Sequence, residues 1–309
     1  MSGVDRVIRQ RLHSDVPLIR QVSEYIIGGG GKRLRPAVVL LAAGACGYSG
    51  GAHYQLAAVV EFIHTATLLH DDVVDDSDLR RGRATANTLF GNPASVLVGD
   101  FLYSRAFQLM VEQTNIRVMQ VLADATNTIA EGEVLQLLNC HNPAVTEEDY
   151  LRVIHYKTAK LFEAAGQIGA IISQSTPEVE ASLARYGMHL GTAFQLIDDV
   201  LDYSGDHAET GKNLGDDLAE GKPTLPLICA IQRGTPGQAE LIRGAIEHGG
   251  LQEFQPVLAA IRDTGALDYT RRQAMLESQR AMEAVASLPH SSYRDSLLQL
   301  AAFAASRTY

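Results

Sequence analysis

The sequence lacks tryptophan altogether, and aromatic residues make up only 6% of its 309 positions. Cysteine is almost as scarce, because only Cys46, Cys140 and Cys229 are present and none of them belongs to a Cys-x-x-Cys pair. Three scattered cysteines argue against a disulfide framework or a zinc site. We therefore expect a protein of a reducing compartment.

Long apolar runs are also missing. The longest, Ala37–Cys46, is far shorter than the roughly 20 residues that a membrane-spanning helix needs. The opening residues, MSGVDRVIRQ, are charged and contain no apolar core of the kind that a signal peptide carries. The sequence thus predicts a cytoplasmic protein with no transmembrane segment.

Positive charge is in deficit, since 26 Lys and Arg residues stand against 36 Asp and Glu residues and the formal net charge is −10. Nucleic-acid binders supply basic surface to phosphates, so we expect no nucleic-acid partner. The chain also shows no Ser–His–Asp order, no catalytic-cysteine signature and no His-Glu-x-x-His motif. It therefore gives no support for an acyl-transfer or zinc-peptidase site.

What the sequence has instead is helical periodicity along nearly its whole length. Hydrophobic residues make up 46% of the chain, which is enough for a large core. Apolar positions recur at intervals of three and four, and strand-like alternation between hairpin turns is missing. The expected helical stretches cover residues 55–74, 94–111, 118–138, 150–173, 178–203, 269–287 and 293–305.

Helix punctuation agrees with this pattern. We expect Thr146 as an N-cap, Pro36 as the first residue of one helix and Pro177 at the start of another. The segments Gly28–Gly31 and Asp206–Lys222 are expected to be loops, and no linker, repeat or low-complexity tract divides the chain. We predict a single all-α domain over residues 1–309, a bundle of ten or more helices around a central apolar cavity.

Two acidic clusters of the form Asp-Asp-x-x-Asp close apolar helical stretches. They contain Asp71, Asp72 and Asp75, and Asp198, Asp199 and Asp202. The first and last aspartates of each cluster share a helix face, where like charges repel unless a cation lies between them. Carboxylate oxygens suit Mg²⁺, which keeps several waters and is commonly shared with substrate phosphates. One such cluster could be a solvated helix end, but two copies favour a metal site.

Basic residues suggest an anion near these clusters. A glycine run leads into Lys32 and Arg35, and glycine-rich backbone beside a helix start favours phosphate binding. The run is not a P-loop, because no strand precedes it and no Ser or Thr follows the Gly-Lys pair. A solvated basic turn is the plainer alternative. Arg80 and Arg81 follow the first acidic cluster, where arginines around a magnesium–diphosphate complex would explain both signs of charge.

Further candidate phosphate contacts are the side chains of Lys157, Thr158, Lys212 and Lys222. Any one of the lysines alone is more often a surface charge than a ligand. His64 precedes Asp71 by about two helical turns and so shares roughly its helix face. Together these residues imply metal-assisted handling of a diphosphate, in which stabilising the charge of a leaving diphosphate is the main catalytic contribution.

The motifs resemble those of the trans-polyprenyl diphosphate synthase family. The similarity runs from about Ile26 to the C-terminal helices, and it is strongest in GGGKRLRP, EFIHTATLLHDDVVDDSDLRRGRATAN, NPASVLVGDFLYSRAF, IAEGEVLQL, KTAKLFEAA, GTAFQLIDDVLDY and GKNLGDDLAEGKPTLP. The members that it resembles most are the bacterial ones that make an eight-unit, octaprenyl side chain for ubiquinone or menaquinone. The resemblance implies an isoprenoid-synthase fold and a homodimer.

The resemblance also implies residue roles. It implies three Mg²⁺ ions, with Asp71, Asp75 and Asp198 as ligands and Asp72, Asp199 and Asp202 beside them. The positions that match the family's isopentenyl diphosphate contacts are Lys32, Arg35, His64 and Arg81. Those that match its contacts to the allylic substrate, farnesyl or geranyl diphosphate, are Arg80, Lys157, Thr158, Gln195, Lys212 and Lys222. The basic C-terminal tail of some short-chain members is replaced here by Ser306-Arg307-Thr308-Tyr309, so no role is transferred there.

The implied reaction is ionisation of the allylic diphosphate, condensation with isopentenyl diphosphate and loss of a proton. Ala66 stands where short-chain members tend to carry an aromatic residue, so we expect it to let a long product pass. A shorter-chain synthase, making a geranylgeranyl or farnesyl product, and a non-catalytic partner subunit are the alternatives. A terpene cyclase is disfavoured, because it should lack the basic loop and the second acidic cluster.

Overall fold

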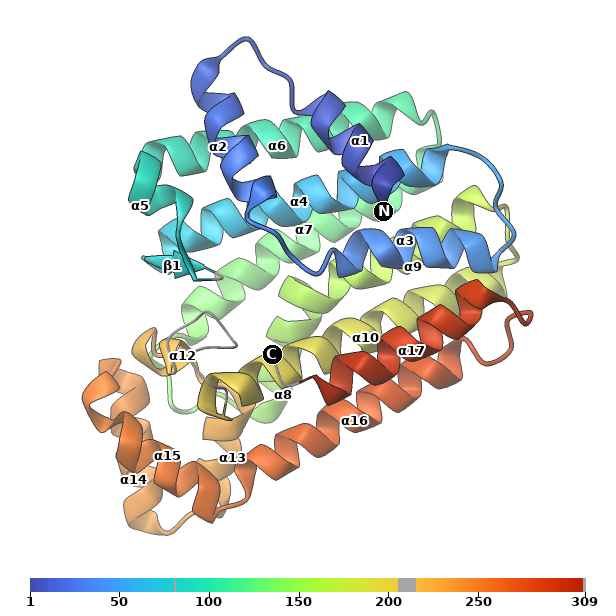
Figure 1. Cartoon of the computed structure of the whole chain (residues 1–309). Helices are drawn as coiled ribbons and strands as arrows, with labels where there is room; N and C mark the ends of the chain where they lie inside the picture. Colours follow the sequence, from blue (N-terminus) through green and yellow to red (C-terminus); the bar gives the residue numbers. More distant parts are fainter. Residues whose placement is uncertain (81, 205–214, 308–309) are drawn as a thin grey trace. The chain divides into compact units, whose positions relative to one another are not determined.

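The computed structural model describes residues 1–80, 82–204 and 215–307. In these ranges the chain is almost entirely helical, and the all-α prediction with ten or more helices is confirmed (Figure 1). The elements are α1 (Ser2–Arg11), α2 (Pro17–Gly28), α3 (Leu34–Ala45), α4 (Ala52–Val74), β1 (Leu79–Arg80), β2 (Arg83–Ala84), α5 (Ala86–Phe90), α6 (Asn92–Glu112), α7 (Ile116–Asn139), α8 (Glu147–Ile154), η1 (His155–Ala159), α9 (Lys160–Ile172), α10 (Pro177–Ser204), α12 (Asp216–Ala219), α13 (Leu225–Arg233), α14 (Pro236–His248), η2 (Leu251–Glu253), α15 (Phe254–Asp263), α16 (Ala266–Ala284) and α17 (Ser292–Ser306).

The helices form two compact units. Unit 1 contains Met1–Thr126, Leu161–Gly187 and Val285–Leu297. Unit 2 contains Asn127–Lys160 together with the described residues of two further segments, Met188–Ala284 and the segment that follows Leu297. None of the helices in the described ranges combines the length and the apolar character that crossing a membrane requires.

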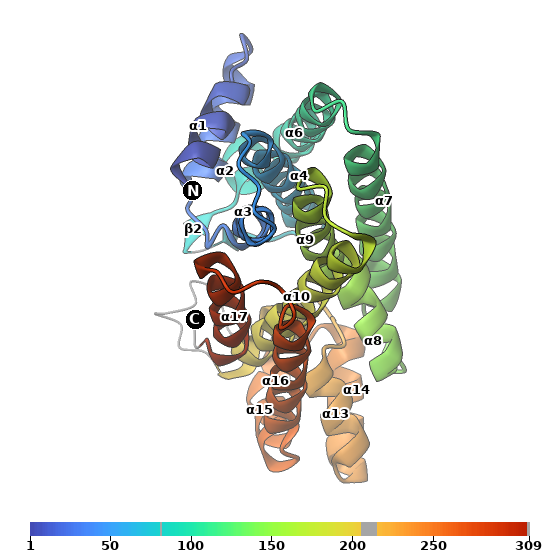
Figure 2. The same ribbon diagram turned by 90° about the vertical axis from the view of Figure 1, so that its right-hand side faces the viewer.

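Helix α4 is the centre of unit 1. It packs against α1, α3 and α6, and Figure 2 shows α3 and α6 beside it. Every side chain from Leu56 to Ile63 is buried, so the helix is covered on all sides over two turns. The apolar periodicity predicted helices that are apolar over most of their circumference, and α4 has this property. Its C-terminal end carries the first acidic cluster.

Most expected helices end within a few residues of their predicted limits, and two N-terminal signals are confirmed. Thr146 Oγ accepts the N–H of Asp149 at 3.2 Å and forms a capping box at the start of α8. Pro177 is the first residue of α10. The prediction for Pro36 is wrong by two residues, since α3 begins at Leu34. Proline is tolerated at this third position because the first N–H groups of a helix have no intrahelical partner.

Three local features differ from the sequence expectations. A hairpin, β1–β2, pairs Leu79 with Ala84 directly after the first acidic cluster, although no strand was expected. Within the expected loop 206–222, residues Asp216–Ala219 form the short helix α12, and residues 206–214 lie outside the described ranges. The expected helix 150–173 is interrupted by the π-helical segment η1.

The π-helical segment lies against α7 at a glycine. A Cβ atom on Gly132 would come within 2.6 Å of the Lys157 backbone nitrogen, so only glycine permits this approach. π-Helical turns are rare and occur frequently at functional sites. Here the turn contains two of the candidate phosphate contacts, Lys157 and Thr158.

Candidate active site

The first acidic cluster occupies the last turn of α4. The Asp75 N–H donates to the Asp71 carbonyl oxygen at 2.8 Å, so these two residues lie one turn apart on the same face, as the spacing predicted. Both side chains are half-buried, whereas Asp72, rotated by about 100°, is completely buried. The cluster therefore presents two carboxylates outward and one inward.

Asp72 holds Arg80 in place. One carboxylate oxygen, Oδ1, accepts from Arg80 Nε at 2.8 Å and lies 2.6 Å from Arg80 Nη2. The other oxygen, Oδ2, is buried without a hydrogen-bond partner in the described ranges. Burial raises the pKa of Asp72, and the Arg80 guanidinium opposes this shift. Of the two arginines that follow the cluster, Arg80 is thus fixed on it, and Arg81 lies outside the described residues.

Arg35 and His64 lie together in unit 1, one from α3 and the other from α4. Their side-chain nitrogens, Nη1 and Nε2, are 3.2 Å apart, and the Arg35 guanidinium lies 4.3 Å from the centre of the Phe162 ring. A guanidinium over an aromatic face is held by a cation–π interaction. Two of the predicted isopentenyl diphosphate contacts therefore form one positioned pair of nitrogen groups.

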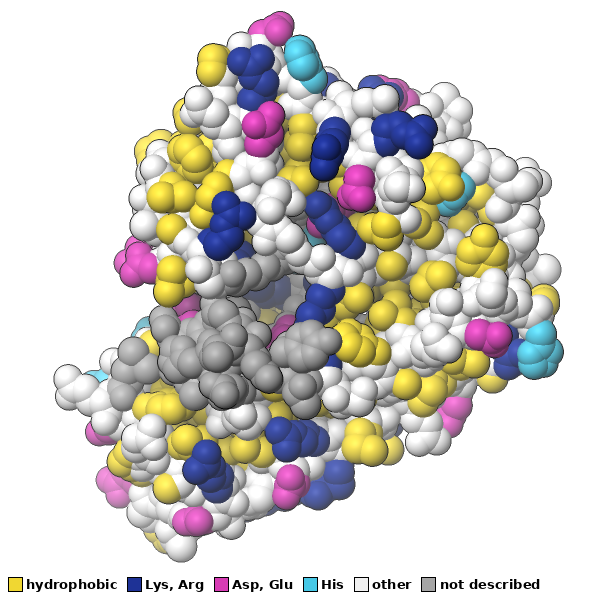
Figure 3. Space-filling model, in the orientation of Figure 1, with side chains coloured by type: hydrophobic (Ala, Val, Ile, Leu, Met, Phe, Trp, Pro, Cys, Tyr) yellow, Lys and Arg dark blue, Asp and Glu magenta, His cyan; other side chains and the backbone are white. Residues whose placement is uncertain are grey.

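Arg33 supports the glycine loop that carries Lys32, and the sequence assigned it no role. Its guanidinium forms an ion pair with the buried Glu61 of α4 and donates to the Ile27 carbonyl oxygen at 3.3 Å. Gly30 has a φ of +80°, a conformation that glycine adopts at low cost. The loop is thus tied to α4 by Arg33, while Lys32 is exposed. On the face that Figure 3 shows, several basic side chains lie over the region of α2 and α3.

The second acidic cluster lies near the end of α10, in unit 2, and repeats the pattern of the first. Asp198 and Asp202 are half-buried, and Asp199 is only 2% exposed. Asp199 accepts from the Tyr150 hydroxyl and, at 2.8 Å, from Gln195 Nε2. Burial, with the negative charge of Asp217 nearby, raises the pKa of Asp199 to about 8.

Four proposed allylic-diphosphate contacts have defined partners in unit 2. Thr158 Oγ1 donates to Gln195 Oε1 at 3.2 Å, which brings these two predicted residues together. Lys157 Nζ lies 2.5 Å from Glu133 of α7. Lys222 forms an ion pair with Glu220, and Lys212 lies outside the described residues. Lys157 and Lys222 are therefore held by carboxylates of this chain.

Arg307 is a contact of the second cluster that the sequence did not reveal. Its Nη2 lies 2.7 Å from Asp198 Oδ1, and its guanidinium lies 3.7 Å from the centre of the Phe194 ring. The Arg307 side chain is only 2% exposed. No local pattern could predict this ion pair, because more than one hundred residues separate the two partners in the sequence. A basic residue at the end of the last helix was the only signal.

The donor chemistry of both clusters fits a magnesium ion shared with a phosphate. In the described ranges, no three side chains of His, Cys, Asp or Glu converge to form an all-protein metal cage. Mg²⁺ rarely uses such cages, because it keeps waters and takes one or two carboxylates together with substrate phosphates. The half-buried pairs Asp71–Asp75 and Asp198–Asp202 offer such oxygens.

Comparisons with known proteins agree with this chemistry. A family model described as polyprenyl synthetase matches residues 16–261. The octaprenyl diphosphate synthase of Escherichia coli (strain K12) is 56% identical, over 99% of this chain and 95% of its own. That of Haemophilus influenzae is 54% identical, over 100% and 94%.

A solved structure is similar over the whole chain. It is a polyprenyl synthase from Caulobacter crescentus CB15, 46% identical, with a TM-score of 0.97 and coverage of 100% of this chain and 95% of that one. That protein was crystallised in complex with calcium and isoprenyl diphosphate.

From the Arg307–Asp198 ion pair we predict that the effect of Mg²⁺ on the protein's stability depends on Arg307. Arg307→Ala should lower the stability of the metal-free protein by about 2 kcal/mol, because Asp198 loses a charged hydrogen bond. Adding Mg²⁺ should then raise the melting temperature of this variant more than that of the wild type, since the ion no longer competes with a guanidinium. Thermal melts with and without Mg²⁺ measure both effects.

Arg117→Ala is the matched control, because it removes an arginine from an ion pair with Glu180, which belongs to unit 1 and lies about five helical turns before Asp198 on α10. Its response to Mg²⁺ should equal that of the wild type. A Mg²⁺ response of Arg307→Ala no larger than the control's would contradict the competition.

Proposed function

Because the chain belongs to the polyprenyl synthetase family, we propose that it is a long-chain trans-polyprenyl diphosphate synthase that makes an octaprenyl product. The chain is a prenyltransferase, and its substrates are isopentenyl diphosphate and an allylic diphosphate, which we propose to be farnesyl or geranyl diphosphate. The high identity to octaprenyl diphosphate synthases over nearly full lengths supports the product class. We propose one polyprenyl synthase domain over residues 1–309, a cytoplasmic location and a role in making a quinone side chain.

The proposal assigns each site residue a role. Asp71, Asp75 and Asp198 bind the metal, supported by Asp72, Asp199 and Asp202. Lys32, Arg35, His64 and Arg81 bind isopentenyl diphosphate. Arg80, Lys157, Thr158, Gln195, Lys212 and Lys222 bind the allylic diphosphate. The observation that carries these roles is the same in both clusters: the buried second aspartate holds a side chain that can bind phosphate, Arg80 or Gln195, and two half-buried carboxylates lie beside it in the helix.

We propose Mg²⁺ as the resident metal, with about three ions per site. When bound, these ions would neutralise the allylic diphosphate as it leaves. The side chains of Arg80 and Lys157 would hold the same diphosphate by charge-assisted hydrogen bonds. The pair Arg35–His64 would hold the second substrate by its own diphosphate, and the contact of Arg35 with the Phe162 ring would keep the guanidinium in place.

In the proposed reaction, the allylic C–O bond breaks and its electron pair leaves with the diphosphate. The double bond of isopentenyl diphosphate supplies the electrons of the new C–C bond. A proton is then lost, with the released diphosphate as its acceptor, and a new allylic diphosphate results. Each cycle lengthens the product by one unit, and we propose that the tail enters an apolar tunnel between helices, where dry walls protect the cation.

Replacing one proposed metal ligand tests the function. The purified wild-type protein alone should release diphosphate from farnesyl and isopentenyl diphosphate in the presence of Mg²⁺. Asp71→Ala should lower this turnover roughly a hundredfold or more, because it removes a ligand of the ion. Its melting temperature should stay within about 4 °C of the wild type, since the substitution also relieves like-charge repulsion.

Asp263→Ala, which removes an exposed carboxylate at the end of α15, is the control and should keep full turnover. No turnover by the wild-type protein alone would favour the alternative of a non-catalytic partner subunit. Near-normal turnover by Asp71→Ala would rule out the proposed metal site.

Ala66 tests the proposed product length. This residue is fully buried in α4, a little more than one turn before Asp71. We propose that Ala66 lies at the floor of the product tunnel and that its small side chain lets a long tail pass. Ala66→Phe should shorten the product to about three or four isoprene units while diphosphate release continues, because the metal ligands lie more than about 5 Å further along the helix. Chromatography of the product measures the length.

Close packing is the competing reason for an alanine at this buried position, and overpacking costs about 1–3 kcal/mol. A thermal melt therefore accompanies the product analysis, and Ala66→Leu is the milder second variant. If the folded variants still make an eight-unit product, the assignment of Ala66 to the tunnel floor is wrong. A short product from the wild type itself would favour the shorter-chain alternative.

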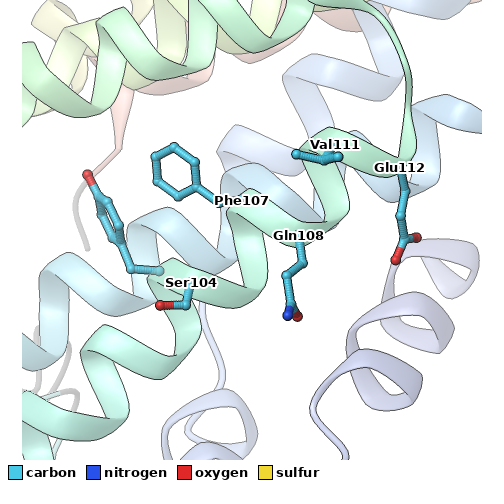
Figure 4. A pocket seen from close by; sticks show the side chains of 6 residues that line it. Ser104, Phe107, Gln108, Val111 and Glu112 are labelled. Carbon is cyan, nitrogen blue, oxygen red and sulfur yellow. The ribbon is translucent and has the colours of Figure 1, made fainter.

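We propose a homodimer that is formed by apolar side chains of α6 and of the start of α7, which belong to unit 1. On α6, Leu97 is 66% exposed and Val111 is 57% exposed, and their spacing puts them on nearly the same face. Figure 4 shows Phe107 and Val111 projecting from α6 beside a shallow pocket. The start of α7 adds Ile116, which belongs to the same unit as α6 and is 67% exposed. Contiguous exposed apolar side chains are typical of protein interfaces.

Val111→Glu should shift the protein from dimer to monomer, because a charge would be buried at the interface. Size-exclusion chromatography with light scattering gives the mass. Leu89→Glu on α5, where Leu89 is 52% exposed, is the control and should leave the mass unchanged. A wild-type protein that runs as a monomer would refute the proposed dimer.

A further inference from the structure

Tyr150 begins a buried chain of hydrogen bonds that ends at two of the proposed allylic-diphosphate contacts. Its hydroxyl donates to Asp199 Oδ2, and Gln195 Nε2 donates to Asp199 Oδ1 at 2.8 Å. Gln195 Oε1 accepts from Thr158 Oγ1 at 3.2 Å. All four residues belong to unit 2, and they link α8, α10 and η1.

The chain is anchored at its Tyr150 end by packing. Tyr150 is only 7% exposed, and its ring lies in a hydrophobic cluster that includes Ile154, Leu196 and Leu225. The ring is therefore fixed by apolar contacts, and the hydroxyl is its one polar group. That hydroxyl meets a carboxylate that is itself 2% exposed. A buried carboxylate needs such donors, because water cannot replace them.

The chain sets the direction of the Gln195 amide. An amide donates from its nitrogen and accepts at its oxygen, and Asp199 Oδ1 takes the nitrogen. The amide oxygen must therefore face Thr158, whose hydroxyl hydrogen points at it. Among the described residues, no further hydrogen bond takes the second N–H of Gln195 or the lone pairs of Thr158, so these groups are available to a ligand. A rotation of the Asp199 carboxylate would release this arrangement, and the Tyr150 hydroxyl prevents that rotation.

We propose that Tyr150 is a positioning residue for the allylic substrate: it holds Asp199, which orients Gln195 and, through Gln195, Thr158. This inference rests on the proposed function, in which Gln195 and Thr158 contact the allylic diphosphate. Tyr150 itself touches neither substrate nor metal. Its role differs from that of a purely structural tyrosine, because loss of its hydroxyl should raise the KM for the allylic substrate and leave the KM for isopentenyl diphosphate unchanged.

The test is Tyr150→Phe, which removes the hydroxyl and keeps the ring in its cluster. The KM for farnesyl diphosphate should rise about five- to tenfold, the size expected when the net contribution of one ordinary hydrogen bond is lost. The KM for isopentenyl diphosphate should stay within about twofold of the wild type. In a Gln195→Ala background the same substitution should have no further effect, because its action passes through Gln195.

Tyr186→Phe is the matched control. Tyr186 is also fully buried, and its hydroxyl donates to the Leu297 carbonyl oxygen at 2.8 Å in unit 1. Its loss should lower the melting temperature and leave both KM values unchanged. If Tyr150→Phe is much less stable than this control, binding of the unreactive analogue farnesyl thiodiphosphate, measured by calorimetry on the folded variant in the cold, replaces the KM.

The outcomes separate this inference from the proposed function. A wild-type protein that does not turn over the two diphosphates would refute the function itself. A wild-type protein that turns them over, with an unchanged KM for farnesyl diphosphate in Tyr150→Phe, would overturn only the role of Tyr150. Equal rises in both KM values, or an undiminished effect in the Gln195→Ala background, would also overturn it.

Discussion

The repulsion between carboxylates one helical turn apart is the constraint on which the site depends. Asp71 and Asp75 end an otherwise apolar helix, and Asp198 and Asp202 lie near the end of another. Like charges at this spacing destabilise a helix unless a cation lies near them. In unit 2, Arg307 supplies such a cation to Asp198. Our account is that the fold tolerates the clusters by such internal partners and that the bound metal later takes their place.

The two clusters share a division of roles within the Asp-Asp-x-x-Asp pattern. The second aspartate of each, Asp72 or Asp199, is buried and holds donors of the protein. The first and last aspartates are half-buried and carry oxygens that an ion could reach. This difference follows from the rotation of about 100° between neighbouring helical residues. One aspartate thus orients a basic or amide side chain, and we propose that its two neighbours bind the metal.

The sequence predicted what depends on local periodicity, and it could not predict what depends on distant packing. Apolar spacing placed the long helices α4, α6, α7, α10, α16 and α17, and Thr146 marked the start of α8. The π-helical turn at Thr158 was not predictable, because it depends on the close approach of Gly132 from another helix. The same holds for the Arg33–Glu61 pair, since neither residue's neighbours in the sequence indicate its partner.

The same distinction applies to the candidate site. Residue types and motif spacing supplied nearly all of the candidates, and the resemblance supplied their roles. Only the burial of the side chains distinguishes a cation that anchors the fold from one that faces outward. Arg33 pairs with a buried glutamate, while Lys32 beside it is exposed. Arg307 was missed for a related reason, because its importance comes from a contact with Asp198 and not from a motif.

The most direct test of the central claim measures metal binding with and without a diphosphate. Electron paramagnetic resonance of Mn²⁺ counts the ions bound to the protein, and farnesyl thiodiphosphate serves as the unreactive ligand. Our account predicts weak Mn²⁺ binding by the protein alone and about three tightly bound ions once the ligand is present, because the carboxylates share the ions with phosphate oxygens. Mn²⁺ binding that is unaffected by the ligand, or that persists unchanged in Asp71→Ala, would contradict it.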